Sequence, residues 1–298
     1  MRRSIHAGSW YSNDAEILTE QIDQALSQAV EPFGSALKYI ISPHAGYAYS
    51  LKTAGMSYGI IDTKKVNTVF ILGPSHHLPL KGCAVDVSST LQTPFGELQV
   101  DNDITTELLK GKCFKELSKR NSEEEHSIEM QLPILHYVAN KSNADHIKVV
   151  PIVVGYMLNE GLEDVGQALL PYFEKEDTIF VISSDFCHFG KRFGFTRTGF
   201  EDQDMPIWKA IESLDLDGVK LIVEHDLEGF LAYLRKTKNT ICGRHPIEVL
   251  LKLISMSQLK ITSKMLSYTQ SSKCSERSDS SVSYCSIAGM LSANAAEA

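Results

Sequence analysis

Four short apolar runs constrain the fold of this chain more than any other feature of its sequence. They are LKYIIS (37–42), NTVFIL (67–72), IKVVPIVV (147–154) and TIFVISS (178–184). Because apolar residues fill each run almost continuously, rather than at every second position, both faces of each strand are expected to be buried. Strands of this kind belong to parallel or mixed sheets that helices cover on both sides. The runs therefore predict an α/β protein with a sheet at its centre.

Helical patterns lie between and after these strands. Apolar residues recur at helical spacing over 13–30, 126–139, 161–173, 205–235 and 246–254. Asn13 and Glu16 have the spacing of a capping box for the first of these helices, and Ser122 and Glu125 have it for the second. SVSYCSIAGML (281–291) predicts a last strand. The alternation of strands and helices indicates an α/β/α sandwich around a mixed, largely parallel sheet.

A serine-rich segment, SSKCSERSDSS (271–281), raises the question of a second domain. The segment is short and a predicted strand follows it at once. A loop inside one domain is therefore the favoured interpretation, and a linker between two domains is the alternative. We expect a single domain over residues 1–292 and a frayed tail at 293–298.

Charge and cysteine usage exclude several classes of protein. The chain has 29 basic and 37 acidic residues, a net charge of −8, and no basic stripe, which argues against a nucleic-acid partner. No run approaches the roughly 20 apolar residues of a membrane span, and the opening MRRSIHAGSWY lacks the apolar core of a signal peptide. The six cysteines show no CxxC spacing and do not resemble a disulfide framework. A cytoplasmic protein with reduced thiols is expected.

Polar side chains follow three of the four predicted strands at the point where each strand ends. They are His44 after the first strand, His76 and His77 after the second, and Asp185, Cys187 and His188 after the last. If the strands are parallel, their carboxyl ends meet at one edge of the sheet and these side chains can converge. The sequence therefore predicts a site at this edge, with the histidine pair as one of its walls.

A thiol joins this set from the segment NTICGRHPI. Cys242 stands in a turn with Gly243, before a helix that Pro246 is expected to open as its first residue. A thiol near a helix N-terminus and beside Arg244 is expected to have a stabilised thiolate, which suits a metal ligand or a nucleophile. Two imidazoles and one thiolate are a credible ligand set for a late first-row transition metal.

Each of these residues also has a purely structural interpretation. His44 taken alone would more often be a hydrogen-bonded loop histidine. Cys242 taken alone would more often be a small buried hydrophobic residue. Asp185 and His188 could form a turn with a side-chain cap. The functional interpretation depends on three loops of the same type lying together, and hence on the predicted topology.

Other chemistries find less support in the sequence. A serine hydrolase could pair Ser75 or Ser184 with a histidine and Asp185, but the chain has no G-x-S-x-G elbow. No glycine-rich phosphate loop is present, which argues against nucleotide binding. Four further histidines are assigned to surface or helix positions without chemistry: His6, His126, His136 and His146.

Seven motifs spread over the chain resemble the Memo family, the mediators of receptor-tyrosine-kinase-driven cell motility. They are HAGSWY, PHAGYAYS, ILGPSHH, EEEHSIEMQLP, ISSDFCHFG, NTICGRHPI and SSVSY. That family is similar in fold to the class III non-haem iron extradiol dioxygenases. It is described as a copper-linked redox protein and as a cytosolic effector that recognises phosphotyrosine peptides. The resemblance implies these properties for the present chain.

Carried over motif by motif, the resemblance implies that His44, His76 and Cys242 hold one copper or iron ion. It places Asp185 and His188 beside the metal as catalytic residues. In the dioxygenases a glutamate stands where this chain has the cysteine. Because a thiolate is softer than a carboxylate and favours copper, extradiol cleavage of catechols is expected to be weak or absent.

The resemblance also implies a cleft that contacts a phosphotyrosine peptide. The implied contact residues are Trp10, His44, His76, His188 and Cys242. In this alternative the chain is an adaptor that uses a former enzyme cleft without catalysis. A third possibility is a copper-sequestering protein, in which the thiolate holds copper(I) too tightly for turnover.

Overall fold

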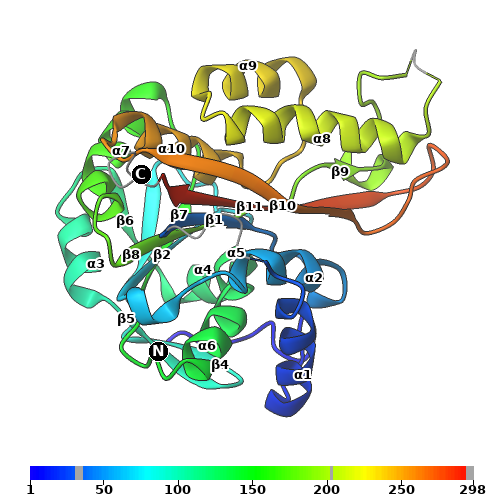
Figure 1. Ribbon diagram of the computed structural model, residues 1–298. Helices are drawn as coiled ribbons and strands as arrows, with labels where there is room; N and C mark the ends of the chain where they lie inside the picture. The colour runs from blue at the N-terminus through cyan, green and yellow to red at the C-terminus, as the bar shows by residue number, and fades with distance from the viewer. Residues whose placement is uncertain (31–35, 202–203, 293–298) are drawn as a thin grey trace, which may run out of the picture.

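The four apolar runs form four adjacent parallel strands at the centre of one large mixed sheet (Figure 1). In sheet order they are β1 (Leu37–Ser42), β8 (Thr178–Ser183), β2 (Thr68–Pro74) and β7 (Lys148–Val154). The computed structural model describes residues 1–30, 36–201 and 204–292, so the tail expected at 293–298 lies outside the described residues. The parallel arrangement predicted from the sequence is confirmed.

Further strands extend this central group on both sides. On one side β11 (Ser281–Leu291) runs antiparallel to β1, and β10 (Ile261–Gln270) runs antiparallel to β11. On the other side β3 (Cys83–Asp86) runs antiparallel to β7, and β6 (Phe114–Leu117) runs parallel to β3. The remaining short strands are β4 (Thr90–Thr93), β5 (Gly96–Val100) and β9 (His188–Phe189). The sheet is therefore mixed, with its parallel part in the middle.

Side chains of the central strands alternate between two separate cores, one on each face of the sheet. Tyr39 and Ile41 enter one core, whereas Ile40 enters the other. The helices of the first face are α3 (Asn102–Leu109), α7 (Asn159–Phe173), α8 (Ile207–Val223), α9 (Leu227–Thr237) and α10 (Arg244–Met256). Those of the second are α1 (Ala15–Leu26), α2 (Tyr47–Tyr58), α5 (His126–Glu129) and α6 (Leu132–Lys141). The expected α/β/α sandwich in a single domain is confirmed.

The first helix begins and ends inside the range that its pattern suggested. Its cap is Asp14, whose carboxylate accepts hydrogen bonds from the backbone N–H groups of Glu16 and Ile17, so the expected capping box at Asn13 is wrong. The side chain of a cap residue must reach the N–H groups two or three positions ahead, and Asp14 is placed for this.

The helix expected over 126–139 is two helices rather than one. The chain turns between α5 and α6, and Glu125 itself caps α5 by accepting a hydrogen bond from the backbone N–H of Ser127. Ser122 lies inside a separate short helix, α4 (Lys119–Glu124), so the second expected capping box is also wrong. The break lets α5 turn toward the carboxyl end of β2, which it contacts.

Two further boundaries differ from expectation. The helical region over 205–235 is broken between α8 and α9, where His225 has a positive φ of 60°. The serine-rich segment connects β10 to its antiparallel partner β11, so it is a hairpin loop and not a domain linker. Among the described residues, no helix combines the length and the hydropathy needed to cross a membrane.

Candidate functional site

The polar side chains that follow the strands meet at the carboxyl edge of the sheet. His44, His76 and Asp185 each stand two residues beyond the end of a strand, β1, β2 and β8 respectively. Because these strands are parallel neighbours, the three loops lie side by side. One donor atom each of His44, His76 and Cys242 lies within 4.8 Å of the others. The structure therefore brings together the three residues that the sequence singled out as metal ligands.

Hydrogen bonds fix which nitrogen of His44 is free. Its Nδ1 lies 2.8 Å from Oγ of Ser183, which itself donates to the carbonyl oxygen of Ser127 at 2.7 Å and accepts from Nε2 of Gln131 at 2.8 Å. A hydroxyl has one hydrogen to donate, so Ser183 must accept from His44, and Nδ1 carries the proton. The lone pair on Nε2 then points toward Sγ of Cys242, 3.1 Å away. This is the tautomer that a metal ligand requires.

His76 is oriented in the same manner by a carboxylate. Its Nδ1 lies 2.8 Å from Oε1 of Glu125, and its backbone N–H donates to Oε2 at 2.6 Å. Burial alone raises the pKa of Glu125, but the hydrogen bonds and the charge of His76 outweigh burial and hold this pKa below its ordinary value. The ionised carboxylate keeps the proton on Nδ1 and leaves Nε2 as the donor atom facing the site.

Cys242 reaches the site because the chain passes very close to β8. A Cβ on the next residue, Gly243, would collide with Ser184, so only glycine fits at this approach. Helix α10 begins at Arg244, two residues before the proline that was expected to open it. Burial, and next the nearby Asp185, raise the pKa of the Cys242 thiol, so the expected stabilised thiolate is wrong for the protein alone. A bound cation supplies the positive charge that reverses this effect.

Asp185 and His188 lie beside this cluster, and each is oriented by a different partner. Oδ1 of Asp185 accepts hydrogen bonds from the backbone N–H groups of His44 at 2.8 Å and Ala45 at 3.3 Å. The ring of His188 is oriented instead by its Nδ1–H, which donates to the carbonyl oxygen of Phe186 at 2.9 Å. Asp185 therefore fixes the loop that carries a candidate ligand, and Nε2 of His188 is left with a lone pair.

The serine hydrolase alternative finds no support in this geometry. Oγ of Ser184 donates to the carbonyl oxygen of Asp185 and accepts from the backbone N–H of Gly243. Oγ of Ser75 donates to the carbonyl oxygen of Leu78. Both hydroxyl protons are thus taken by carbonyl groups, and neither serine is aligned with a histidine base.

Sequence reasoning missed His126, which lies at the centre of the cleft. Its ring stacks on His76 with centroids 4.2 Å apart and contacts Trp10 at 4.5 Å on its other side. Burial lowers the pKa of His126 to about 2, so this ring is neutral. The assignment of His126 to a helix position without chemistry overlooked the polar run EEEH in front of it, which was the only local signal.

The N-terminal segment forms the outer wall of the cleft, and one buried carboxylate holds it there. Glu129 is fully buried and accepts hydrogen bonds from Nη1 of Arg2, from the backbone and the ring of His6, and from the hydroxyl of Tyr11. Burial opposes ionisation of Glu129, but the hydrogen bond from His6 and the charge of Arg2 outweigh it and lower its pKa. Trp10 stands between these anchors and is 37% exposed.

The site opens into a cleft with a volume of about 690 Å³. Trp10, His44, His76, Asp185 and His188 all contribute to its wall. Arg192 and three serines of the β10–β11 hairpin loop also line it: Ser271, Ser272 and Ser280. Three other residues named from the sequence are not part of its wall: Cys242, whose Sγ lies 3.1 Å from Nε2 of His44, the exposed His77, and the buried Cys187, whose backbone N–H donates to Asp215. Asp185 is the single carboxylate among the described residues of the wall.

Comparison with known proteins identifies the family of this chain. Residues 2–288 match the family model described as Memo-like protein. The chain is 40% identical to Protein MEMO1 of Danio rerio over 288 residues, which is 95% of each chain. It is 39% identical to Protein MEMO1 of Homo sapiens over 95% of both chains. A MEMO1 family protein of Schizosaccharomyces pombe is 37% identical over 95% of this chain and 97% of its own length. The chain therefore belongs to the Memo family.

Proposed function

We propose that this protein binds one copper or iron ion and uses it in redox chemistry, with His44, His76 and Cys242 as ligands. The observation that carries the proposal is the convergence of three donor atoms within 4.8 Å. Both histidines donate Nδ1–H to a neighbouring oxygen, which leaves Nε2 free for a metal. A hydrogen bond from the ring nitrogen that does not face the metal to a nearby oxygen is characteristic of metal-ligating histidines.

The donor set bears on which metal and which chemistry fit. Two imidazoles with one thiolate suit copper better than the two-histidine, one-carboxylate set of non-haem iron oxygenases. A bound copper or iron ion supplies one-electron transfer. We therefore expect little extradiol cleavage of catechols. The copper-sequestering alternative has the same ligands and differs from the redox proposal only in that the bound ion takes no part in catalytic turnover.

Two residues of the cleft have proposed roles beside the ion. Nε2 of His188 accepts and returns a proton as general base and acid, because its other nitrogen is held by the carbonyl of Phe186. Asp185 positions the backbone of the His44 loop through two N–H groups. The protein's part in the reaction is then to hold the ligands and to move a proton at His188.

Metal analysis of anaerobically purified protein tests the ligand assignment. We expect about one ion per chain after loading with copper(I), and stoichiometric binding should be lost in Cys242→Ala while the circular dichroism spectrum is retained. Cys113→Ser changes a half-buried thiol outside the site and serves as the matched control. Unchanged binding by Cys242→Ala would remove the thiolate from the proposal.

We also propose that the same cleft accepts a phosphotyrosine side chain of a peptide, through which the protein would act in the cytoplasm in receptor tyrosine kinase signalling and cell motility. The exposed indole of Trp10 offers stacking area at the mouth. Arg192 and Ser280, which also line the cleft, offer donors to a phosphate. A single carboxylate in the wall keeps repulsion small although the chain carries a net charge of −8.

Replacement of the indole separates this second role from metal binding. Trp10→Ala should lower the affinity for a phosphotyrosine peptide by more than about tenfold, because an aromatic contact at a hot spot contributes ~2 kcal/mol or more to binding. The metal content should not change, since an indole offers no ligand atom. Calorimetry on apo protein, copper-loaded protein, Trp10→Ala and the control Trp208→Phe measures both. Equal affinity in all four would leave the peptide without a site in this cleft.

A further inference from the structure

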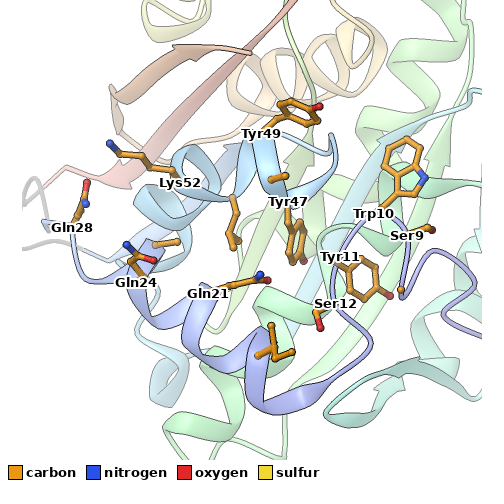
Figure 2. A pocket seen from close by; sticks show the side chains of 15 residues that line it. Ser9, Trp10, Tyr11, Ser12, Gln21, Gln24, Gln28, Tyr47, Tyr49 and Lys52 are labelled. Carbon is orange, nitrogen blue, oxygen red and sulfur yellow. The ribbon is translucent and has the colours of Figure 1, made fainter. Parts of the chain in front are cut away.

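A second hollow adjoins the cleft, and we name it the α1–α2 groove. It lies between α1, α2 and the loop that carries Ser9, Trp10 and Ser12, as Figure 2 shows, and its volume is about 710 Å³. Ser9, Trp10 and Tyr49 line both the groove and the cleft, so the two hollows meet at these three residues. A ligand that enters the cleft can therefore continue into the groove.

The length of the groove suits a chain better than a small molecule. Its wall on α1 extends from Ile17 to Ala25, and eight helical steps of about 1.5 Å give roughly 12 Å, with Gln28 beyond the end of the helix. An extended polypeptide covers this helical part of the wall with about four residues at ~3.3 Å each. A tyrosine-sized group already occupies the cleft in our proposal, so the groove offers space for the residues beside it.

Glutamine side chains are the main polar groups of this wall. Gln21 and Gln24 lie three positions apart on α1, Gln28 follows just after the helix, and all three line the groove (Figure 2). Each primary amide offers two donors and an acceptor, which is what the N–H and C=O groups of an extended main chain need. Within the part of the chain that the structure describes, the side-chain amides of Gln21 and Gln24 have no hydrogen-bond partner.

Apolar exposure and charge at the groove narrow the class of ligand. Ile17, Trp10 and Tyr49 are 51%, 37% and 63% exposed, which is unusual for large apolar side chains that lie together. Lys52 is the single charged residue among the described lining residues, and no acidic residue lines the groove of this acidic protein. An acidic residue in the ligand would therefore meet a cation and no repulsion.

We propose that the α1–α2 groove binds the main chain of an extended polypeptide whose phosphotyrosine side chain occupies the cleft. The amides of Gln21 and Gln24 bind its backbone groups, and Lys52 favours an acidic residue in the flanking segment. This inference rests on the proposed binding of phosphotyrosine and deepens it, because it assigns the residues that flank the phosphotyrosine to the groove.

Two probes test the groove separately from the cleft. The first is phosphotyrosine with capped termini, which fills the cleft alone. The second carries five flanking residues, alternately alanine and glutamate, and is made in an N-terminal and a C-terminal version. We expect one of the two versions to bind the full-length protein at least about tenfold more tightly than the capped amino acid, since the flank adds contacts without a second association cost.

Variants on α1 and α2 assign that gain to the groove. In Gln21→Ala/Gln24→Ala the ratio of the two dissociation constants should fall to about one, whereas Glu20→Ala, an exposed position of α1 outside the groove, should keep the wild-type ratio. The wild type should bind the glutamate flank more tightly than a matched flank in which glutamine replaces each glutamate, and Lys52→Met should abolish this preference. All changes lie at exposed positions, so thermal unfolding should stay unchanged.

Each other outcome is decisive. A wild-type ratio in the double variant, or a flanked peptide that binds no better than the capped amino acid, overturns the groove while leaving the cleft proposal intact. Failure of both probes to bind overturns both proposals. Binding of the flanked peptide without binding of the capped amino acid supports the groove and contradicts the cleft. A change of oligomeric state in the double variant, seen by analytical ultracentrifugation, would assign the groove to a second copy of the chain and overturn the inference.

Discussion

The inner end and the mouth of the cleft are built by different means. At the inner end, His44 and Asp185 extend from parallel strands, and their polar atoms bond to groups next to those strands, such as Ser183. At the mouth, Trp10 belongs to an irregular N-terminal segment that is tied down by side chains, chiefly by Glu129. The inner end therefore inherits the rigidity of the sheet, whereas the mouth depends on one buried carboxylate.

This difference indicates which parts of the site keep their position when a single side chain is changed. Ladder hydrogen bonds and two hydrophobic cores hold the strand ends, so a single side-chain change there alters a donor atom without moving the loop. The N-terminal segment is held by a few backbone hydrogen bonds, such as that from the N–H of Tyr47 to the carbonyl oxygen of Trp10, and by the buried ion pair of Arg2 with Glu129. Removal of either partner of this pair leaves the other charge buried and unpaired. Changes at the mouth are thus expected to affect stability, and changes at the inner end to affect ligand binding.

The largest effect is expected from Glu129→Gln, which keeps the shape of the side chain and removes its charge. Arg2 is then left buried without a counter-ion, and we expect the free energy of unfolding to fall by about 3–5 kcal/mol. Urea unfolding followed by circular dichroism measures it. In a Trp208→Phe background, the fluorescence of Trp10 should also shift toward that of a more exposed indole.

The control is an ion pair whose two partners are both open to solvent. Lys141 and Asp23 are 57% and 44% exposed, so Asp23→Ala should cost less than about 1 kcal/mol. Equal losses in the two variants would show that the mouth does not depend on burial of the Glu129 carboxylate, and the contrast between the two ends of the cleft would then be wrong.

An effect of intermediate size is expected from replacement of Asp215, a buried carboxylate that hydrogen-bonds to the loop of His188. Its Oδ1 accepts the backbone N–H of Cys187 and Nδ2 of Asn239. Burial raises the pKa of Asp215 from 3.8 to about 6, although these hydrogen bonds oppose the shift. Because the folded state holds this proton more tightly, the contribution of Asp215 to stability falls as the pH rises from about 4 to 6.

The expected loss is about 3 kcal/mol, since each pKa unit corresponds to ~1.4 kcal/mol. Asp215→Asn cannot ionise and does not undergo this loss. The unfolding free energy of the variant, minus that of the wild type, should therefore rise by about 3 kcal/mol between pH 4 and pH 7. Urea titrations at intervals of half a pH unit give the difference. A difference that does not change with pH would show that Asp215 titrates normally.

A smaller effect is expected from Ser183→Ala at the inner end. The change removes the acceptor that holds the Nδ1 proton of His44, and the imidazole is then free to adopt the other tautomer. Loss of such a partner typically weakens metal binding 10–100-fold, or roughly 1.4–2.7 kcal/mol. Anaerobic titration with copper(I) against a chromophoric chelator measures it. Ser57→Ala, at a buried serine of α2 outside the cleft, is the control and should leave the affinity unchanged.

The sequence by itself determined the central sheet and the residues at its carboxyl edge. Continuous apolar runs can only be buried on both faces, and this favours parallel strands between two layers of helix. Once the strands are parallel, the loops carrying His44, His76 and Asp185 must lie at one edge. Strand β10 was not predicted, because it is half-buried and its sequence, ITSKMLSYTQ, mixes apolar with polar residues.

The tertiary structure alone decided which groups surround those residues. Glu129 meets Arg2 across 127 positions of the chain, and Ser183 meets His44 across 139, so no local pattern announces either contact. The same holds for His126, which entered the cleft because the chain turns between α5 and α6. Periodicity reports which face of a strand or helix is buried, whereas the direction of a hydrogen bond depends on neighbours that only folding brings within reach.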